Sequence, residues 1–252
     1  MSAPILHRHL PDDLIEARPL PGVRPVSGRW LRVDQAYNAQ MAERERLIGA
    51  QRREVIYLDD AARPAADELL HQILGMLSSF DFDFDFDVDK TVQCPDGRSV
   101  FIEPDDPLGT LGRLVQCDLC ILQKQGDEHV LTGAVLCFPA SWRLSEKAGH
   151  PLTRIHDPIP EYDANLARRV QRLFDGVRVG QPIWRFNRLW YEDPALYQPR
   201  SEAQPRPVMP GESAPFYRSE RQTVFRLPKT TAVVFAIHTY VLRRADVPHQ
   251  LL

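Results

Sequence analysis

The sequence has no run of about 18 consecutive apolar residues, the length that a membrane-spanning helix needs. It also lacks an excess of charge: the formal net charge is −3, which disfavours a general nucleic-acid-binding surface. Glycine is scarce, at 13 of 252 residues, and this argues against collagen-like and flexible low-complexity chains. With 43% hydrophobic residues the chain can bury a sizeable core, so we expect one large domain rather than a tandem array.

Cysteine is also sparse, with only Cys94, Cys117, Cys120 and Cys137. A chain of this length does not need disulfides to hold its core, so we expect free thiols in a cytoplasmic protein. The N-terminal residues contain no apolar signal core, which agrees with that location. The pair Cys117 and Cys120 has CxxC spacing, but no second pair for zinc follows, and residues three apart on a strand point to opposite faces. Packed thiols are therefore favoured over a redox or metal role.

The common motifs of nucleotide and hydrolase chemistry are missing as well. No Walker loop, GxGxxG, HExxH or GxSxG sequence occurs. Nucleotide hydrolysis, dinucleotide binding and serine-hydrolase chemistry thereby lose their usual sequence support.

Proline, by contrast, is abundant: the chain has 22, nearly 9% of its residues, against an average of about 5%. Five of them fall in residues 1–29, which we expect to form an extended arm anchored by Trp30 over a single domain at 30–252. Apolar spacing predicts a helix over 33–55 with Asp34 as its N-cap. A second helix should begin near Pro64 and end near Ser78.

Alternation of apolar and polar residues takes over in the second half of the chain. A hairpin is predicted from Asp118, and a helix that ends just before Gly176 interrupts the strands. Three more strands are predicted around 182–192, 217–228 and 230–244. About five mostly antiparallel strands with helices before and between them indicate an α+β fold.

The segment at 80–89 alternates Phe with Asp, which predicts a half-buried strand or an edge loop. A calcium site is a weaker interpretation, because the turn glycine and terminal glutamate of the helix-loop-helix calcium site are missing.

Two histidines lie in a stretch bounded by prolines, KAGHPLTRIHDPIPEYD. Proline fixes the backbone, and a rigid loop is a way to present a side chain. On this ground His156 is a candidate metal or haem ligand, and a hydrogen-bonded structural histidine is the alternative.

Arginines alternate with aromatic residues on the last predicted strands. They are Arg185, Arg188, Arg218, Arg221 and Arg226. Because arginine pairs with carboxylates in a bidentate fork, this pattern suits an apolar ligand that carries carboxylates. A solvated outer face with surface ion pairs explains the same pattern.

Several segments resemble, in order from about Trp30 to Tyr240, the haem-dependent oxidative N-demethylase family and its haem-binding alpha-subunit-like chains. They are WLRVDQAYNAQMAERERLI, LVQCDLCIL, FPASWRLSEKAGHPLTRIHDPIPEYD, RFNRLWYEDP and RSERQTVFRLPKTTAVVFAIHTYV. The most specific are K-x-G-x-x-L-x-x-I-H-x-P-[IV]-P and R-x-E-R-Q-T-x-x-R-L-P. The sequence departs from the family pattern Gln-Glu-Asp-Leu, because Cys117 stands in place of the glutamate.

The resemblance implies a PAS-like antiparallel sheet and a non-covalent b-type haem. It also implies oxygen-dependent removal of a methyl group from a small secondary amine, with electrons from a separate flavin and iron-sulfur reductase. By its place in the motif, His156 is the implied proximal haem ligand. The same strand motif contains Arg218, Glu220, Arg221, Gln222 and Arg226.

With this resemblance the arginine-rimmed apolar face is explained as a haem site. The haem propionates would pair with arginines among Arg185, Arg218, Arg221 and Arg226. Glu220 is then a candidate to orient a cationic amine, and Tyr240 or His238 is a candidate hydrogen-bond donor. No nucleic-acid or membrane partner is expected. Two alternatives stay open: a haem-binding PAS-like sensor or carrier without turnover, and an interaction protein without haem.

Overall fold

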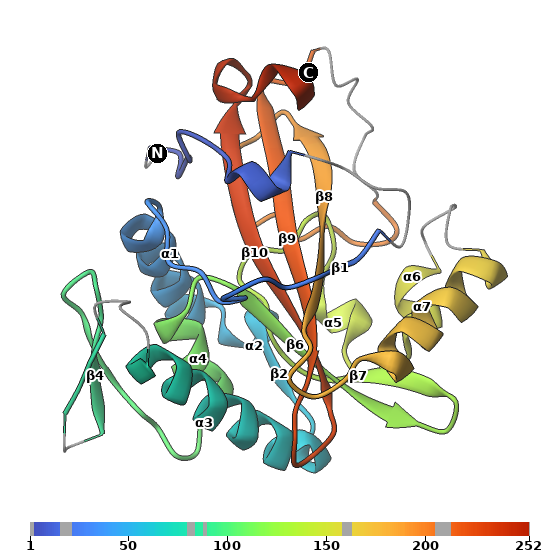
Figure 1. Cartoon of the computed structure of the whole chain (residues 1–252). Helices are drawn as coiled ribbons and strands as arrows, with labels where there is room; N and C mark the ends of the chain where they lie inside the picture. Colours follow the sequence, from blue (N-terminus) through green and yellow to red (C-terminus); the bar gives the residue numbers. More distant parts are fainter. Residues whose placement is uncertain are drawn as a thin grey trace.

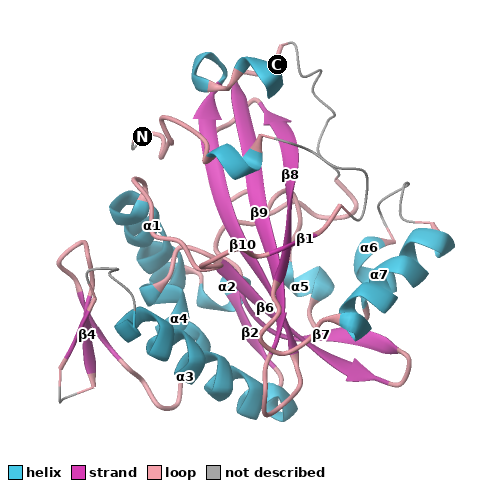
Figure 2. Ribbon diagram, viewed as in Figure 1, coloured by secondary structure: helices cyan, strands magenta, loops and turns pink. Residues whose placement is uncertain are grey.

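The computed structural model describes residues 3–15, 22–79, 84–87, 90–157, 163–204 and 213–251. These residues form an α+β fold in which long antiparallel strands are flanked by helices on both sides (Figures 1 and 2). The predicted α+β class is therefore confirmed. No helix in the described part of the chain is both long and apolar enough to cross a membrane.

The main sheet of the described residues has seven antiparallel strands. Their order is β1 (Arg24–Pro25), β8 (Ile183–Tyr191), β9 (Phe216–Arg226), β10 (Val233–Arg243), β6 (Asp118–Gln125), β7 (Glu128–Val135) and β2 (Ile56–Leu58). Strands β6 to β10 are the five that alternation predicts, and they are confirmed. The edge strands β1 and β2 have two and three residues, too few to leave a period in the sequence.

A second, three-stranded sheet stands beside the main one (Figure 1). It consists of β3 (Asp85–Phe86), β4 (Thr91–Gln93) and β5 (Ser99–Phe101). The Phe and Asp alternation at 80–89 leads into this sheet, but only residues 84–87 of it are described. Most of the strand or loop predicted there therefore lies outside the described residues.

Three helices cover one face of the main sheet, which we name the α1–α4 face. They are α1 (Tyr37–Ala50), α3 (Arg63–Ser79) and α4 (Pro107–Leu114), with the short α2 (Arg52–Val55) after α1. Leu69 and Ile73 of α3 are completely buried, and they share a core with Trp30 and with Phe225 of β9. This apolar stripe is the reason that α3 forms as its sequence predicts.

Three other helices, α5 (Leu144–Lys147), α6 (Leu152–His156) and α7 (Ala164–Gly176), cover the opposite face. We name it the α5–α7 face. Leu152 and Phe174 pack there against Val224 of β9 and Ile237 of β10. Because Val224 and Phe225 are neighbours on one strand, they point to opposite faces and join different cores. Short 3-10 turns complete the described elements: η1 (Asp12–Leu14), η2 (Asp60–Ala62), η3 (Arg244–Asp246) and η4 (His249–Leu251).

The first predicted helix differs from the observed one at its start. The helix begins at Tyr37 with Ala36 as its N-cap, so the prediction of Asp34 as N-cap is wrong. The Asp34 carboxylate accepts a hydrogen bond from the Ala36 amide at 2.9 Å, and its other oxygen faces two histidines. Asp34 therefore contacts two histidines that are remote in sequence, and it does not serve as the N-cap of the helix. The helix also breaks at Gln51, which separates α1 from α2.

The N-terminal segment crosses the β8, β9 and β10 strands on the α1–α4 side (Figure 1). Trp30 is buried, with its ring centroid 4.5 Å from that of Phe225, and this confirms Trp30 as an anchor. The His7 amide donates to the Val241 carbonyl at 2.7 Å. The segment is thus attached to β10 by its backbone as well as by side chains.

A buried cluster of two histidines and one carboxylate holds this segment against the sheet. Oδ2 of Asp34 lies 2.8 Å from Nε2 of His238 and 3.0 Å from Nε2 of His7. Burial lowers the pKa of His238, and hydrogen bonds from the two histidines bring the pKa of Asp34 far below its usual range although burial opposes them. The cluster therefore favours neutral His238 beside an ionised Asp34.

This cluster predicts acid sensitivity of the fold. His238 has a folded-state pKa below its ordinary value of 6.5, so the unfolded chain binds more protons as the pH falls beneath that value. We expect the free energy of unfolding to drop by on the order of 1 kcal/mol between pH 7 and pH 5. Urea unfolding at several pH values measures it. The His238→Asn variant should show a flatter profile, whereas His71→Ala, at an exposed position, should keep the original slope. An unaltered slope in His238→Asn would contradict the assignment.

Candidate functional site

The predicted site residues of β9 divide between the two faces of the sheet. Arg218, Glu220 and Gln222 point to the α5–α7 face, and Arg221 points to the α1–α4 face, because successive strand residues alternate. The strand register places Arg185 opposite Gln222, and Asn187 opposite Glu220. Residues from β8 and β9 therefore form one polar row on the α5–α7 face.

The centre of this row is a buried ion pair. Nη2 of Arg218 lies 3.1 Å from Oε1 of Glu220, and the two side chains are 1% and 6% exposed. The same guanidinium donates to the carbonyls of Leu196 and Phe138. Arg218 is thus fully engaged by protein acceptors, and its charge balances that of Glu220.

The second oxygen of Glu220 faces amide groups. Nδ2 of Asn187 donates to Oε2 of Glu220 at 2.8 Å, and the Glu220 amide donates to Oδ1 of Asn187 at 2.8 Å. Gln222 donates to the same Oε2 at 3.4 Å. Asn187 was not predicted, since only the register of β8 against β9 brings it beside Glu220. Its place on the same alternating strand as Arg185 is the one sequence signal for it.

The row continues to a partly exposed area at Arg185. Nη1 of Arg185 donates to Oε1 of Gln222 at 2.9 Å, and burial lowers the pKa of this guanidinium while the charge of Glu220 partly opposes the change. Ile183 of β8 and Phe235 of β10 are half-buried on the same face. A cation therefore borders an apolar surface of the sheet here.

His156 ends the short helix α6, which packs on the α5–α7 face. Its Nδ1 lies 2.8 Å from the Leu152 carbonyl, so Nδ1 carries the proton and Nε2 the lone pair. Burial lowers the pKa of His156, and the nearby charge of Lys147 adds to the effect. The imidazole is thereby kept neutral, the form that coordinates metals.

Lys147 also fixes the helix that carries this histidine. Its ammonium donates to the Ile155 carbonyl and to a carboxylate oxygen of Glu202. Arg154 binds the other oxygen of Glu202 at 3.1 Å. These contacts attach α6 to α5 and to the segment near Glu202.

Arg221, His238 and Tyr240 lie on the other side of the sheet, apart from the row at Glu220. Arg221 donates to the Trp30 carbonyl at 3.2 Å and stacks over the Trp184 ring at 4.4 Å. Its pKa is lowered to about 10, chiefly by burial. The structure thus does not bring these three residues together with His156, and their predicted roles stay predictions.

Tyr240 belongs to this opposite group by its contacts as well as by its strand position. Arg32 donates to its hydroxyl at 3.4 Å, and its ring centroid lies 4.8 Å from that of His238. Burial raises the pKa of Tyr240 to about 12, so the phenol keeps its proton at neutral pH.

Arg226, the last predicted arginine, holds the end of α7. Its guanidinium donates to the carbonyls of Phe174 and Val177 at 2.7 Å each. Favourable pairing of a cation with the last helical carbonyls is the usual arrangement at a helix C-terminus. This contact gives Arg226 a structural role in the described part of the chain.

The CxxC cysteines lie on opposite faces, as the strand period predicts. Cys117 belongs to the core of the α1–α4 face and Cys120 to that of the α5–α7 face. Both are buried free thiols. Burial raises the pKa of Cys117 to about 12, so this thiol is not activated as a nucleophile.

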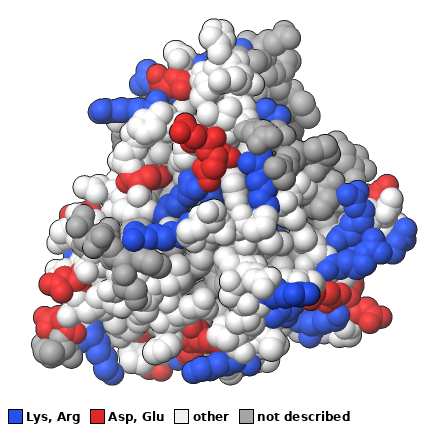
Figure 3. Space-filling model, in the orientation of Figure 1, with Lys and Arg blue, Asp and Glu red and all other residues white. Residues whose placement is uncertain are grey.

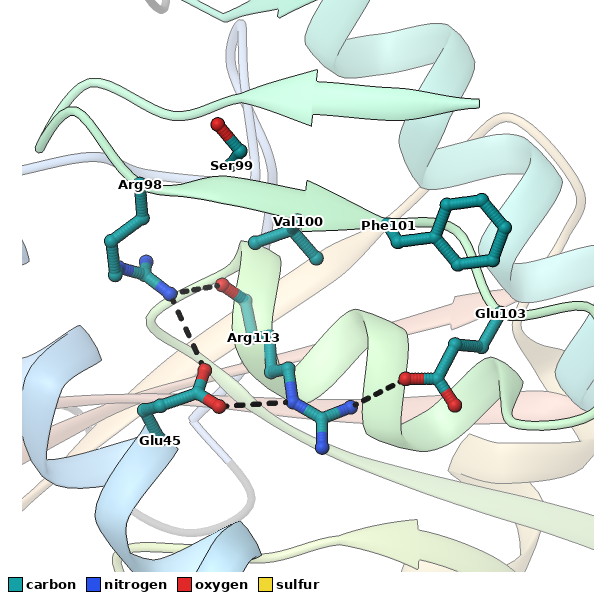
Figure 4. Close-up of a pocket in the computed structure, with 7 residues that line it drawn as sticks. All are labelled: Glu45, Arg98, Ser99, Val100, Phe101, Glu103 and Arg113. Atoms are coloured by element: carbon teal, nitrogen blue, oxygen red, sulfur yellow. Dashed lines mark hydrogen bonds and ion pairs between the residues drawn. The ribbon is translucent and has the colours of Figure 1, made fainter. Parts of the chain in front are cut away.

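A hollow of about 250 Å³ lies between α1, α4 and β5, away from the predicted residues (Figure 4). Glu45 there pairs with Arg113 at 3.2 Å and with Arg98 at 3.6 Å, and Glu103 pairs with Arg113 at 3.5 Å. These charges neutralise one another, and none of the predicted site residues lines this hollow.

A comparison with known protein families identifies the family of this chain. A family model described as haem-dependent oxidative N-demethylase, alpha subunit-like, matches residues 23–251. The chain belongs to this family. The resemblance predicted from the sequence is confirmed, and the family name indicates a haem-dependent oxidoreductase of the oxidative N-demethylase type.

The α5–α7 face of this family member fits the haem that the family name implies. A neutral imidazole whose Nδ1–H is fixed by a carbonyl has the chemistry of a haem-iron ligand, and His156 has this hydrogen bond. Half-buried Ile183 and Phe235 offer flat apolar contacts on the same face, and Arg185 offers a cation for a carboxylate. In the described residues no group of three or more metal-ligating side chains occurs, and a haem iron needs only one such ligand.

The buried pair at the centre of the row gives a stability prediction. Arg218→Met should cost about 3–5 kcal/mol of the free energy of unfolding, because Glu220 would remain buried without its cation. The double variant Arg218→Met/Glu220→Gln should recover a large part of that loss. Chemical denaturation of these two variants, of Glu220→Gln and of the unaltered protein completes the double-mutant cycle. Additive losses would show that the two charges do not stabilise each other.

Proposed function

We propose that the chain is a haem-binding oxidase that removes a methyl group from a small secondary amine. Bound haem would supply the site where oxygen is reduced and the methyl group is oxidised. The observation that carries the proposal is the environment of His156. Its Nδ1 is hydrogen-bonded to the Leu152 carbonyl, and burial lowers its pKa. His156 is accordingly proposed as the axial ligand of a b-type haem. The family match over residues 23–251 supports it.

Arg185 is the proposed partner of the haem propionates. It lies on the same face as α6, at the margin of the apolar contacts from Ile183 and Phe235. The other three predicted arginines are engaged elsewhere: Arg218 by Glu220 and carbonyls, Arg226 by the end of α7, and Arg221 on the opposite face. The proposal for the propionates therefore rests on Arg185.

The reaction needs electrons from outside the chain. Its balance is R–NH–CH₃ + O₂ + 2 H⁺ + 2 e⁻ → R–NH₂ + HCHO + H₂O, so each turnover consumes two electrons. We propose that a separate flavin and iron-sulfur reductase delivers them, as the family resemblance implies.

Glu220 is the proposed group that orients the amine. A secondary amine is protonated at neutral pH, and Oε2 of Glu220 is held in place by Asn187 while Oε1 is taken by Arg218. Such preorganised acceptors favour a cation at a defined position. Tyr240 and His238 lie behind the sheet, and the proposal therefore does not use them.

The ligand assignment predicts a spectroscopic change. Purified protein should show a haem Soret band, and His156→Ala should lose the haem or shift the band, because the iron would lack its axial nitrogen. Exposed His150, six residues earlier, provides a matched control, and His150→Ala should keep the spectrum. Added imidazole should restore the band in His156→Gly. An unchanged spectrum in His156→Ala would exclude His156 as the ligand.

The amine assignment predicts a change in affinity. Glu220→Gln removes the negative charge that faces the amine, and we expect amine affinity and formaldehyde production to fall at least about ten-fold. Glu43→Gln, on the outer side of α1, is the control. Spectral titration of the haem with candidate amines measures affinity apart from turnover. Normal affinity together with normal turnover would remove Glu220 from the mechanism. Haem binding without formaldehyde from any amine would instead favour a sensor or carrier.

A further inference from the structure

The outer surface of α7 and the turn after it carry exposed arginines. Arg168 and Arg172 lie on α7, and Arg178 follows the helix. Figure 3 shows Lys and Arg side chains gathered at the position of α7 in Figure 1. Within the described ranges, none of these three arginines forms an ion pair. Their charges are therefore available to a partner.

The inner side and both ends of α7 are attached to the rest of the protein. Phe174 is buried against the sheet and Val170 packs beside it. Asp163 caps the start of the helix by accepting from the Leu166 amide at 2.7 Å, and Arg226 binds the carbonyls at its end. The helix that carries Arg168 and Arg172 is consequently held in a fixed position on the sheet, as a specific docking surface requires.

A groove of about 530 Å³ adjoins the arginines. It runs between the end of α7 and strands β1 and β8, and Arg172, Leu173, Arg178, Val26 and Ile183 are among its lining residues. Val179, next to Arg178, is 48% exposed, one of two large hydrophobic residues that stand out in this way on the described surface. The surface thus combines an apolar centre with a cationic rim.

The groove lies close to the proposed haem face. Ile183 lines the groove and also packs into the core of the α5–α7 face, and Arg185 follows two residues later on β8. Helix α6, which ends at His156, packs against α7. A protein seated on this surface would be near the proposed haem.

We propose that this surface, formed by α7, residues 177–183 and the adjoining groove, is the docking site for an acidic electron-transfer protein. The inference rests on the proposed function, which requires two electrons per turnover. Charge complementarity speeds encounter and orients the partner, and small interfaces of this kind suit partners that must separate after each transfer.

The same observations favour a protein over a nucleic acid. The chain as a whole has a net charge of −3, and the arginines of this surface occupy only one helix and the turn after it. Neighbouring Lys124 is neutralised by Asp175 at 2.6 Å. A long phosphate backbone would need a more extended basic surface.

The test uses the haem-loaded protein and a reduced, acidic plant-type [2Fe–2S] ferredoxin as the probe. Stopped-flow spectroscopy at low salt follows the Soret band as the ferredoxin reduces the haem. The double variant Arg172→Glu/Arg178→Glu should lower the second-order rate at least about ten-fold, because repulsion replaces attraction. Added salt should slow the reduction of the unaltered protein and have little effect on this variant.

Matched controls separate this proposal from the proposed function. Arg8→Glu/Arg243→Glu makes the same charge change at exposed positions on other segments and should keep the rate within two-fold. Dithionite should reduce the haem of all proteins equally, since it needs no docking. A protein that binds no haem would refute the proposed function, and salt-dependent binding of oxidised ferredoxin to it would still report on the surface.

The docking surface has its own contrary outcomes. Equal ferredoxin rates in the two double variants would overturn the proposal, and so would failure of the ferredoxin to reduce a haem that dithionite reduces. Tight binding of a 20-base-pair DNA duplex that is lost in Arg172→Glu/Arg178→Glu would assign the patch to nucleic acid instead.

Discussion

The pleat of β9 is the constraint on which the rest of the structure depends. This strand lies between β8 and β10, and it buries Arg218 and Glu220 on one face and Arg221 on the other. A buried charge is tolerated only with partners, so each face must supply them. On one face Arg218 pairs with Glu220 and the carbonyls of Leu196 and Phe138. On the other face the N-terminal segment supplies the Trp30 carbonyl to Arg221.

The two faces acquire different chemistry as a result. The N-terminal segment closes the α1–α4 face, where Asp34 collects two histidines in a buried cluster. The α5–α7 face keeps Ile183, Arg185 and Phe235 half-buried. A flat ligand with an apolar body and carboxylates is therefore better accommodated by the second face. The order of charged residues along one strand thus decides which side of the sheet is available.

Helices and strands with a clear apolar period could be predicted from the sequence. Side-chain contacts between residues far apart in the sequence could not. Helix α3 and strands β6 to β10 carry a clear apolar period, and they form as predicted. Asp34 has the chemistry of an N-cap, but its tertiary partners His7 and His238 are 27 and 204 residues away and outweigh the local role. Asn187 escapes prediction because its pairing with Glu220 depends on strand register.

Strand alternation alone predicts which charged residues of β9 point to each face of the sheet. The arginine motif gathers Arg218, Arg221 and Arg226 within nine residues, and adjacency in sequence invites a single site. Period two separates Arg221 from the others before any contact is known. Alternation does not predict which acceptors each guanidinium binds. Arg226 donates to carbonyls at the end of α7, and Arg218 donates to carbonyls that are distant in sequence.

The proposed docking groove and the proposed amine position lie at different points along β8. Ile183 lines the groove beside α7, and Asn187 holds the carboxylate of Glu220 four residues further on, which is about 13 Å along an extended strand. The groove and the carboxylate of Glu220 are therefore separate points along one strand. Electrons would then reach the α5–α7 face at the start of β8, and the amine would reach it beside the middle of the same strand.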